Sequence, residues 1–244
     1  MPAVSPRPHR ALIRDLTAAL EAVADPGRAP QQQAYMKSEM PYLGVAAPDL
    51  HRACRETFKK HVISDADVWQ ATAGQLWRKA RFREYRYAAV ELLGYRRYRP
   101  FYDPDLMDLL EEFIVTGAWW DHVDAIAINL VGALLAQHPR VLKPRLARWS
   151  KDQDIWRRRT SIIAQLKFKS ATDTKLLIAC IEPSVEESEF FLRKAIGWAL
   201  REYSKTDPQL VIDYVTDNAH RLSGLSKREG LKVLLKQGLI DQIP

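Results

Sequence analysis

Aromatic residues recur along this chain at an interval of 35 or 36 residues, and this spacing restricts the fold more than any other feature. They are Tyr85, Trp120, Trp156 and Phe191, and one further step of 35 reaches Ser226. Each lies near the start of a segment whose apolar residues recur every three or four positions, the pattern of an amphipathic helix. Self-similarity at this length is typical of helix pairs stacked into a solenoid. Coincidence among aromatic residues in an irregular helical bundle is the alternative.

The rest of the chain has the same helical character. Leu12, Leu16 and Leu20 lie on one stripe of a segment over residues 9–24, which predicts an amphipathic helix there. Similar segments are separated by short groups of residues that begin or break helices. These groups are Ser64-Asp65, Asp103-Pro104, His138-Pro139, Thr172-Asp173, Pro183-Ser184, Thr206-Asp207-Pro208 and Ser223-Gly224. No segment alternates as a strand does. We therefore expect an all-α chain with a Pro-rich extension over residues 1–8 and a single repeat domain over residues 9–244.

Composition narrows the class of protein. Hydrophobic residues make up 47% of the chain and charged residues 27%, as in ordinary globular proteins. No apolar run approaches the roughly 20 residues of a membrane span, and the first residues do not resemble a signal peptide. Cys54 and Cys180 lack metal-ligand spacing, so reduced thiols in a cytoplasmic, monomeric protein are expected. The net charge of +7 suits a polyanionic partner.

If the repeat is real, the starts of its helices converge on one surface. They bring aromatic residues, cations and one acidic pair: Trp120, Asp121, Asp124, Trp156, Arg157, Arg158, Arg159, Arg193, Lys194, Trp198, Lys227 and Arg228. Cations neutralise phosphates, so this mixture favours a nucleic-acid surface. The three consecutive arginines could instead form a solvated helix face, and at most two of them can face a groove. Trp198 could be a core residue, although the neighbouring Gly197 suggests a close approach of another backbone or of a ligand.

Several strings occur in an order that resembles a known family. They are Trp119-Trp120-Asp121-His122-Val123-Asp124, Ile155-Trp156 with Arg159, and Lys194-Ala195-Ile196-Gly197-Trp198 followed by Leu200-Arg201-Glu202-Tyr203. The chain resembles the DNA alkylation repair glycosylases built from HEAT-like helical repeats, the AlkD-like alkylpurine DNA glycosylases. The resemblance runs from Ala34-Tyr35-Met36-Lys37 to Leu225-Ser226-Lys227-Arg228-Glu229. It departs at the N-terminal extension and at Thr160-Ser161, where a small apolar pair is expected.

The resemblance implies a curved solenoid with a basic concave groove that binds double-stranded DNA. It implies that Asp124 is the catalytic carboxylate and that Trp120 and Trp198 face the lesion. Arg159 matches a residue that contacts the DNA backbone, and Tyr35 matches a tyrosine on the lesion side. The remaining DNA-binding candidates are the cations of the same surface: Arg158, Arg193, Lys194, Lys227 and Arg228.

The implied activity is hydrolysis of the N-glycosidic bond of alkylated purines such as 3-methyladenine and 7-methylguanine, in base excision repair. Ordinary glycoside hydrolysis uses two carboxyl groups, one of which protonates the leaving group. A purine alkylated at N3 or N7 is already cationic and leaves as a neutral base, so one carboxylate, Asp124, suffices to stabilise the sugar cation and orient water. The tryptophan faces would add roughly 0.5–2 kcal/mol each through cation–π contacts. A monofunctional hydrolase without metal or cofactor is expected.

Two residues beside the catalytic candidate receive no chemistry. Asp121 is interpreted as supporting the helix start, and His122 as a bystander rather than a proton shuttle. Whether the target base is flipped out stays open. Two other functions also stay open: a catalytically silent protein that binds distorted DNA, and a helical-repeat adaptor for proteins. The combination of Trp120, Asp124, Arg159 and Trp198 argues against the first, and the mixture of aromatic and cationic residues argues against the second.

Overall fold

The computed structural model describes residues 6–244, which form fourteen α-helices joined by short loops and helical turns; no residue in this range lies in a strand. The all-α prediction is therefore confirmed. The chain divides into two compact units, the first ending at Tyr102 and the second beginning at Asp103. The predicted extension over residues 1–8 falls mostly outside the described residues, and the single domain over residues 9–244 stays a prediction.

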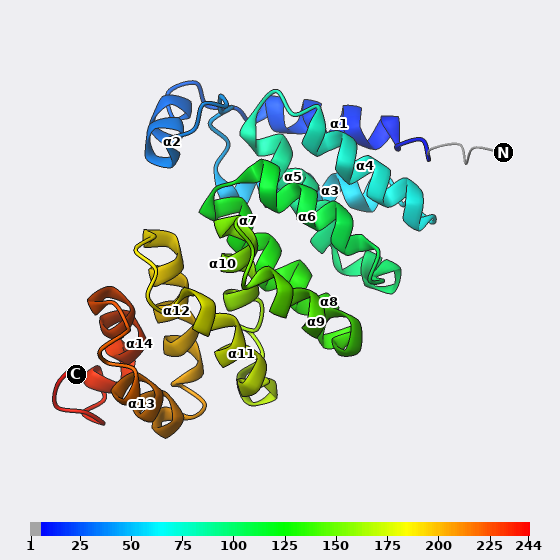
Figure 1. Cartoon of the computed structure of the whole chain (residues 1–244). Coiled ribbons are helices and arrows are strands. Elements are labelled where there is room, and N and C mark those ends of the chain that lie inside the picture. Colours follow the sequence, from blue (N-terminus) through cyan, green and yellow to red (C-terminus); the bar gives the residue numbers. More distant parts are fainter. Residues whose placement is uncertain (1–5) are drawn as a thin grey trace. The chain divides into compact units, whose positions relative to one another are not determined.

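The first unit is a layered set of five α-helices followed by a short 3₁₀ segment (Figure 1). Their bounds are Arg10–Ala22 (α1), Ala29–Met36 (α2), Ala47–Lys60 (α3), Ala66–Arg78 (α4), Arg83–Gly94 (α5) and Arg96–Phe101 (η1). Helix α1 packs on α3 and α4, and α5 packs on the same two helices. Leu12, Leu16 and Leu20 are fully buried, so the apolar stripe predicted for the first helix forms part of this core.

A buried carboxylate fixes the loop between α2 and α3. Glu84 is 1% exposed, and its oxygens accept hydrogen bonds from the backbone N–H groups of residues 43–45 at 2.9–3.2 Å. Gly44 has a φ of +84°, and a Cβ atom there would lie 2.0 Å from the Asp25 carbonyl oxygen. Only glycine fits this position, because both the left-handed backbone and the close approach exclude a side chain.

The second unit contains the remaining nine α-helices of the described chain. Their bounds are Leu106–Gly117 (α6), Trp120–Ile126 (α7), Gly132–Gln137 (α8), Pro139–Trp149 (α9), Ile155–Ile163 (α10), Thr174–Ile181 (α11), Phe190–Tyr203 (α12), Pro208–Asp217 (α13) and Gly224–Lys236 (α14). A π-helical turn, η2, covers Ala127–Val131 and joins α7 to α8 with helical backbone at both junctions. These three segments therefore form one rod.

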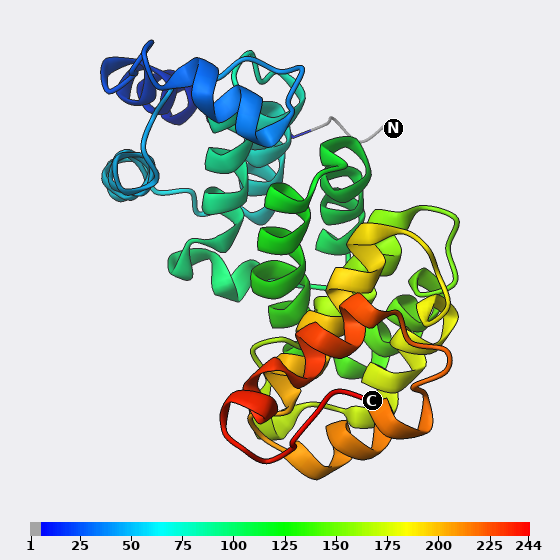
Figure 2. The same ribbon diagram turned by 90° about the vertical axis from the view of Figure 1, so that its left-hand side faces the viewer.

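Equivalent helices of the second unit stack in parallel. Helix α10 packs on α7 and on α12, and α12 packs on α14; Figure 2 shows α12 (yellow to orange) beside α14 (red). The contacting positions advance together along each pair of helices, as in Asp124–Arg159 and Gly132–Ala164, or Gly197–Glu229 and Leu200–Gly230. Such advance requires neighbouring helices to point the same way. The repeat inferred from the sequence is thus visible as stacked helix pairs.

The periodic residues lie at the helix starts, as predicted. Trp120 begins α7, and Trp156, Phe191 and Ser226 lie within the first three residues of α10, α12 and α14. Several of the punctuating residues are N-caps whose side chains accept backbone N–H groups. They are Asp65, Asp173, Asp207 and Ser223. The sequence therefore predicts the starts of these helices correctly.

Candidate functional site

A cleft of about 500 Å³ opens in the second unit over the stacked helices α7, α10, α12 and α14. It is lined by Trp120, Asp124, Arg159, Phe190, Phe191, Lys194, Trp198, Arg201, Glu229 and Lys232. The structure thus brings together six of the residues singled out in the sequence: Trp120, Asp124, Arg159, Phe191, Lys194 and Trp198. Four aromatic rings, four cations and two carboxylates share this one cavity.

Asp124 is held in the cleft by a two-point ion pair. Arg159 donates from Nε to Oδ1 at 2.7 Å and from Nη2 to Oδ2 at 2.8 Å. Its Nη1 donates to the backbone carbonyl of Phe191, and the residue is only 4% exposed. Paired hydrogen bonds of this kind fix both distance and plane of a carboxylate. Arg159 therefore sets the position of Asp124 and ties it to the start of α12.

Opposing effects act on the charge of Asp124. Burial raises the pKa of its carboxyl group above the ordinary value, and the charge of Asp121 adds to this effect. The hydrogen bonds and the charge of Arg159 act to lower the same pKa. A buried carboxylate without its cationic partner would take up a proton much more readily. The ion pair with Arg159 therefore opposes the rise in pKa and favours the charged form of this carboxyl group.

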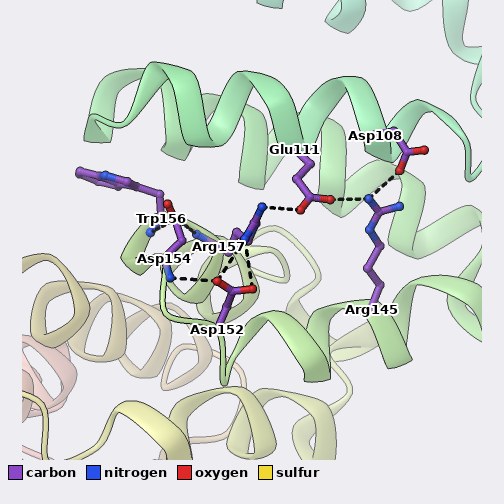
Figure 3. A network of polar contacts seen from close by, with 7 residues as sticks. All are labelled: Asp108, Glu111, Arg145, Asp152, Asp154, Trp156 and Arg157. Atoms are coloured by element: carbon purple, nitrogen blue, oxygen red, sulfur yellow. Dashed lines mark hydrogen bonds and ion pairs between the residues drawn. The ribbon is translucent and has the colours of Figure 1, made fainter.

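Helix α10, which carries Arg159, is anchored on its other side by a polar network (Figure 3). Arg157 pairs with Glu111 of α6 at 2.8 Å and with Asp152 of the preceding loop at 3.1 Å. Asp154 caps the helix by accepting the backbone N–H groups of Trp156 and Arg157, both at 2.9 Å. The three consecutive arginines thus point to different partners. Arg157 is structural, and of the three only Arg159 lines the cleft.

The two tryptophans predicted to face a ligand do line the cleft. Trp120 lies one helical turn before Asp124 on α7, Trp198 lies on α12, and both are half-buried. Trp119, Trp156 and the lining residue Phe191 pack as an aromatic cluster, with ring centroids 4.9–6.2 Å apart. This cluster supports the wall of the cleft. Half-exposed rings on a rigid support can offer a flat face to a bound base or sugar.

Most of the other predicted DNA-binding cations lie elsewhere. Arg158 donates to the Pro183 carbonyl and to Ser184 Oγ, Arg193 donates to the Glu187 carbonyl, and Lys227 donates to the Ala219 carbonyl. These bonds satisfy loops and helix ends around the repeats. Arg228 is exposed on α14 and is also not among the residues that line the cleft. A DNA contact by these four residues stays a prediction.

Tyr35 belongs to the first unit, near the end of α2, where it is 76% exposed. Its lesion-side role stays a prediction.

Asp121 lies in the first turn of α7, where an acidic residue stabilises the helix start. Its Oδ1 is 3.8 Å from Nδ1 of the buried His122. Neither Asp121 nor His122 lines the cleft, and the roles expected for these two residues stay predictions.

Sequence reasoning missed four residues that line the cleft: Phe190, Arg201, Glu229 and Lys232. Arg201 lies three residues after Trp198, so their helical spacing could have placed it on the same face. Glu229 accepts hydrogen bonds from Lys194 at 3.0 Å and Arg201 at 2.7 Å. Burial acts to raise the pKa of Glu229, but Lys194 foremost, with Arg201 and Lys232, brings it below its ordinary value. This second carboxylate is therefore held in its charged form.

The remaining features of the described residues concern cysteine state, metal-binding clusters and membrane-spanning helices. Cys54 and Cys180 are free and buried, and burial raises the pKa of the Cys180 thiol to about 12. Within residues 6–244, no group of three or more histidine, cysteine or acidic side chains is placed to hold a metal ion. Over the same range no helix is both long enough and apolar enough to cross a membrane.

Comparison with known proteins shows a family and a solved structure that this chain is similar to. The family model described as DNA alkylation repair enzyme matches residues 16–234. A solved structure described as a predicted DNA alkylation repair enzyme from Enterococcus faecalis is 30% identical, covers 87% of this chain and 97% of its own, and superimposes with a TM-score of 0.78. No curated protein matches the sequence.

A more distant structure shares the fold. It is the Pseudomonas fluorescens alkylpurine DNA glycosylase AlkC bound to DNA containing an abasic site analogue, at 14% identity and a TM-score of 0.53. The match covers 94% of this chain and 62% of that one. At this identity the similarity concerns the arrangement of helices alone.

Proposed function

Since this chain belongs to the DNA alkylation repair enzyme family, we propose that it is a monofunctional DNA glycosylase for cationic N3- and N7-alkylated purines in duplex DNA. The observation that carries the proposal is the Asp124 carboxylate, held by a two-point ion pair with Arg159 in a cleft that Trp120 and Trp198 also line. The AlkC relative was solved with an abasic site analogue, and an abasic site is the product that such a reaction leaves in DNA.

The proposed reaction breaks the bond between sugar C1′ and the purine nitrogen. The bonding electrons leave with the base, which neutralises its positive charge, and positive charge develops on the sugar. The negative carboxylate of Asp124 stabilises this charge, and water then adds to C1′ and loses a proton. A fixed charge in a water-poor site is effective because it needs no reorganisation as the transition state forms. Arg159 acts as a positioning residue that keeps Asp124 charged and oriented.

The second carboxylate of the cleft is a poor proton donor. Glu229 is paired with Lys194 and Arg201, and its pKa lies below the ordinary value. A general acid near neutral pH needs the opposite shift. Because Asp124 is paired with Arg159 and acts as the anion in the proposed reaction, the cleft favours leaving groups that need no protonation, which are the cationic alkylpurines. It disfavours neutral lesions such as uracil, hypoxanthine and etheno adducts.

The aromatic residues of the cleft suit a cationic lesion. A cation over the face of a tryptophan gains roughly 0.5–2 kcal/mol, depending on how well water is excluded. Trp120 and Trp198 are half-buried, so the gain for this chain belongs in the middle of that range. The expected partner is double-stranded DNA with alkylated bases, and the expected setting is base excision repair in the cytoplasm of a bacterial cell.

The proposal is tested by a single-turnover assay on two duplexes of the same sequence, one with 7-methylguanine and one with hypoxanthine. Release of 7-methylguanine in the presence of a chelator, with hypoxanthine excised at least 100-fold more slowly, is the expected result. Comparable rates would mean that a proton donor operates in the site. Binding to both duplexes without release of either base would identify a catalytically silent DNA-binding protein instead.

A further inference from the structure

A carboxylate of the protein itself sits between two cations in the cleft. Lys194 and Arg201 lie seven residues apart on α12, and both reach the Glu229 carboxylate on α14, at 3.0 and 2.7 Å. Lys232, three residues after Glu229 on the same helix, also lines the cleft and adds a third positive charge nearby. Two cations that hold one carboxylate can equally bind an oxygen of a phosphate, because both groups accept charge-assisted hydrogen bonds.

The position of Glu229 is set by close packing of the two helices. A Cβ atom at Gly197, which lies between Lys194 and Arg201 on α12, would come 2.5 Å from Glu229 Cβ. The backbone of α14 can therefore approach α12 closely only because residue 197 has no side chain. This approach delivers the carboxylate directly between the two cations.

The ion pairs of Glu229 are more exposed to solvent than the Asp124–Arg159 pair of the same cleft. The side chains of Lys194, Arg201 and Glu229 are 36%, 25% and 19% exposed, whereas the side chain of Arg159 in its two-point pair is 5% exposed. Arg193 and Lys227 bind backbone carbonyls, which cannot move away. Solvent-accessible pairs between long side chains gain little free energy, so a competing anion can replace one partner.

We propose that Lys194, Arg201 and Lys232 form a binding site for a backbone phosphate, and that Glu229 occupies this site when DNA is absent. Glu229 thereby lowers the affinity of the protein for duplex DNA of any sequence, lesion-free duplex included. The ligand chemistry is a phosphodiester of a polyanion. The proposal rests on the proposed function only in taking DNA as the ligand, because excision is not needed for the effect.

The test compares Glu229→Gln with Glu202→Gln on undamaged duplex DNA. Glu202 lies on α12, pairs with Lys205 and is not among the residues that line the cleft. Both variants replace one carboxylate by an amide, so they change the net charge equally. Glu229→Gln should bind roughly three- to tenfold more tightly at low salt, with a salt slope steeper by about 0.9, the value for one added phosphate contact. Glu202→Gln should show neither change.

A double-mutant cycle separates occupation of the site from simple orientation of its cations. Arg201→Gln should change the affinity of the wild type little, because Glu229 already neutralises Arg201. The same substitution in the Glu229→Gln background should remove most of the gained affinity. If Glu229 instead orients the cations for phosphate, Glu229→Gln will weaken binding, and the proposal is then wrong. Equal effects of Glu229→Gln and Glu202→Gln would also overturn it.

The result is independent of the outcome of the glycosylase assay. Tighter binding by Glu229→Gln in a protein that releases no base would support the phosphate site while contradicting the proposed reaction. Thermal unfolding shows whether each variant is folded. If Glu229→Gln is not folded, Glu229→Asp withdraws the carboxylate by one methylene and should tighten binding in the same direction; unchanged or weaker binding by that variant would also reject the proposal.

Discussion

Asp124 and Glu229 are carboxylates of one cleft whose pKa values are shifted in opposite directions. Burial dominates at Asp124 and raises its pKa, whereas cations dominate at Glu229 and lower its pKa. Asp124 has the single two-point partner expected of a group held for chemistry. Glu229 has two one-point partners, as expected of a group that is exchanged.

Replacing Asp124 by asparagine should separate chemistry from binding. Asp124→Asn keeps the shape but removes the charge that stabilises the sugar cation, so excision should fall by about two orders of magnitude or more. DNA binding should persist or tighten slightly. Asp121→Asn is the matched control, since this residue lies three positions away and outside the lining of the cleft; its rate should fall much less. Single-turnover excision and equilibrium binding measure the two effects, and exchanged phenotypes would move the catalytic role to Asp121.

The pH dependence of excision should report the Asp124–Arg159 pair. Asp124 must be charged to act, so the rate should fall as pH drops through its raised pKa. Arg159→Met removes the group that opposes the burial effect, so the pKa of Asp124 should rise further and the acid limb should move to higher pH. Arg159→Lys restores one charge and should move the limb back in part. Rates measured between about pH 5 and pH 9 test this, and an unmoved limb in Arg159→Met would contradict the positioning role.

Helix packing decides which side chains meet in the cleft. Helices α12 and α14 approach closely at Gly197, where a Cβ atom would lie 2.5 Å from Glu229 Cβ and 3.0 Å from the Ser226 carbonyl oxygen. The network of Glu111, Arg157 and Asp152 sets the place of α10 in the same stack. The packing of these helices therefore sets the positions of the side chains that line the cleft. A shift of one helix would displace Trp198 and its neighbours together.

Gly197→Ala should destabilise the fold and disturb the cleft. The added methyl group has backbone on one side and Glu229 Cβ on the other, so the free energy of unfolding should fall by about 1–3 kcal/mol. Excision should decrease as well, because α12 carries Trp198. Gly224→Ala is the control, since its Cβ atom would meet only the movable guanidinium of Arg228; its stability should stay within about 0.5 kcal/mol of the wild type. Urea unfolding gives both values, and a silent Gly197→Ala would argue against rigid packing.

At the scale of the whole molecule, ion pairs between side chains make the stability of the fold depend on pH. The chain carries a net charge of +7, yet many of its cations are paired with carboxylates. Lys143 and a backbone N–H group lower the pKa of Asp173, and the backbone N–H of Asp154 is the main cause of the lowered pKa of Asp152. Groups with a lowered pKa stabilise the fold above their unfolded pKa of about 4, and this contribution is lost as pH falls further. The raised pKa of Asp124 acts in the opposite direction.

Acid should therefore weaken the molecule through its paired carboxylates. The melting temperature should fall below about pH 4, where Asp152, Asp173 and Glu229 become protonated in the unfolded chain. Asp173→Asn keeps a helix cap but loses the ion pair with Lys143, so it should cost about 0.5–1 kcal/mol at pH 7. This difference should vanish near pH 2. Thermal unfolding of both proteins across this range tests the prediction, and a difference independent of pH would show that the cap alone matters.

The sequence by itself determined the features that depend on near neighbours. Capping residues and apolar periodicity act within a few positions, so the helix starts, the all-α class and the interval of 35 residues could be read directly. The helical spacing of Trp120 and Asp124 likewise placed both on one face. The family pattern added Arg159 and Trp198, and the structure brings these four residues into one cleft.

Only the tertiary structure decided which cation meets which acid. Arg157, Arg158 and Arg159 are consecutive and chemically identical, yet they reach Glu111, Glu187 and Asp124 respectively. The choice depends on the positions of neighbouring helices and loops that are distant in the sequence. For the same reason Glu229 could not be assigned to the site beforehand, whereas the spacing of Arg201 from Trp198 on α12 was a signal in the sequence. Their meeting depends on the close approach of α12 and α14 at Gly197, and no local pattern encodes that distance.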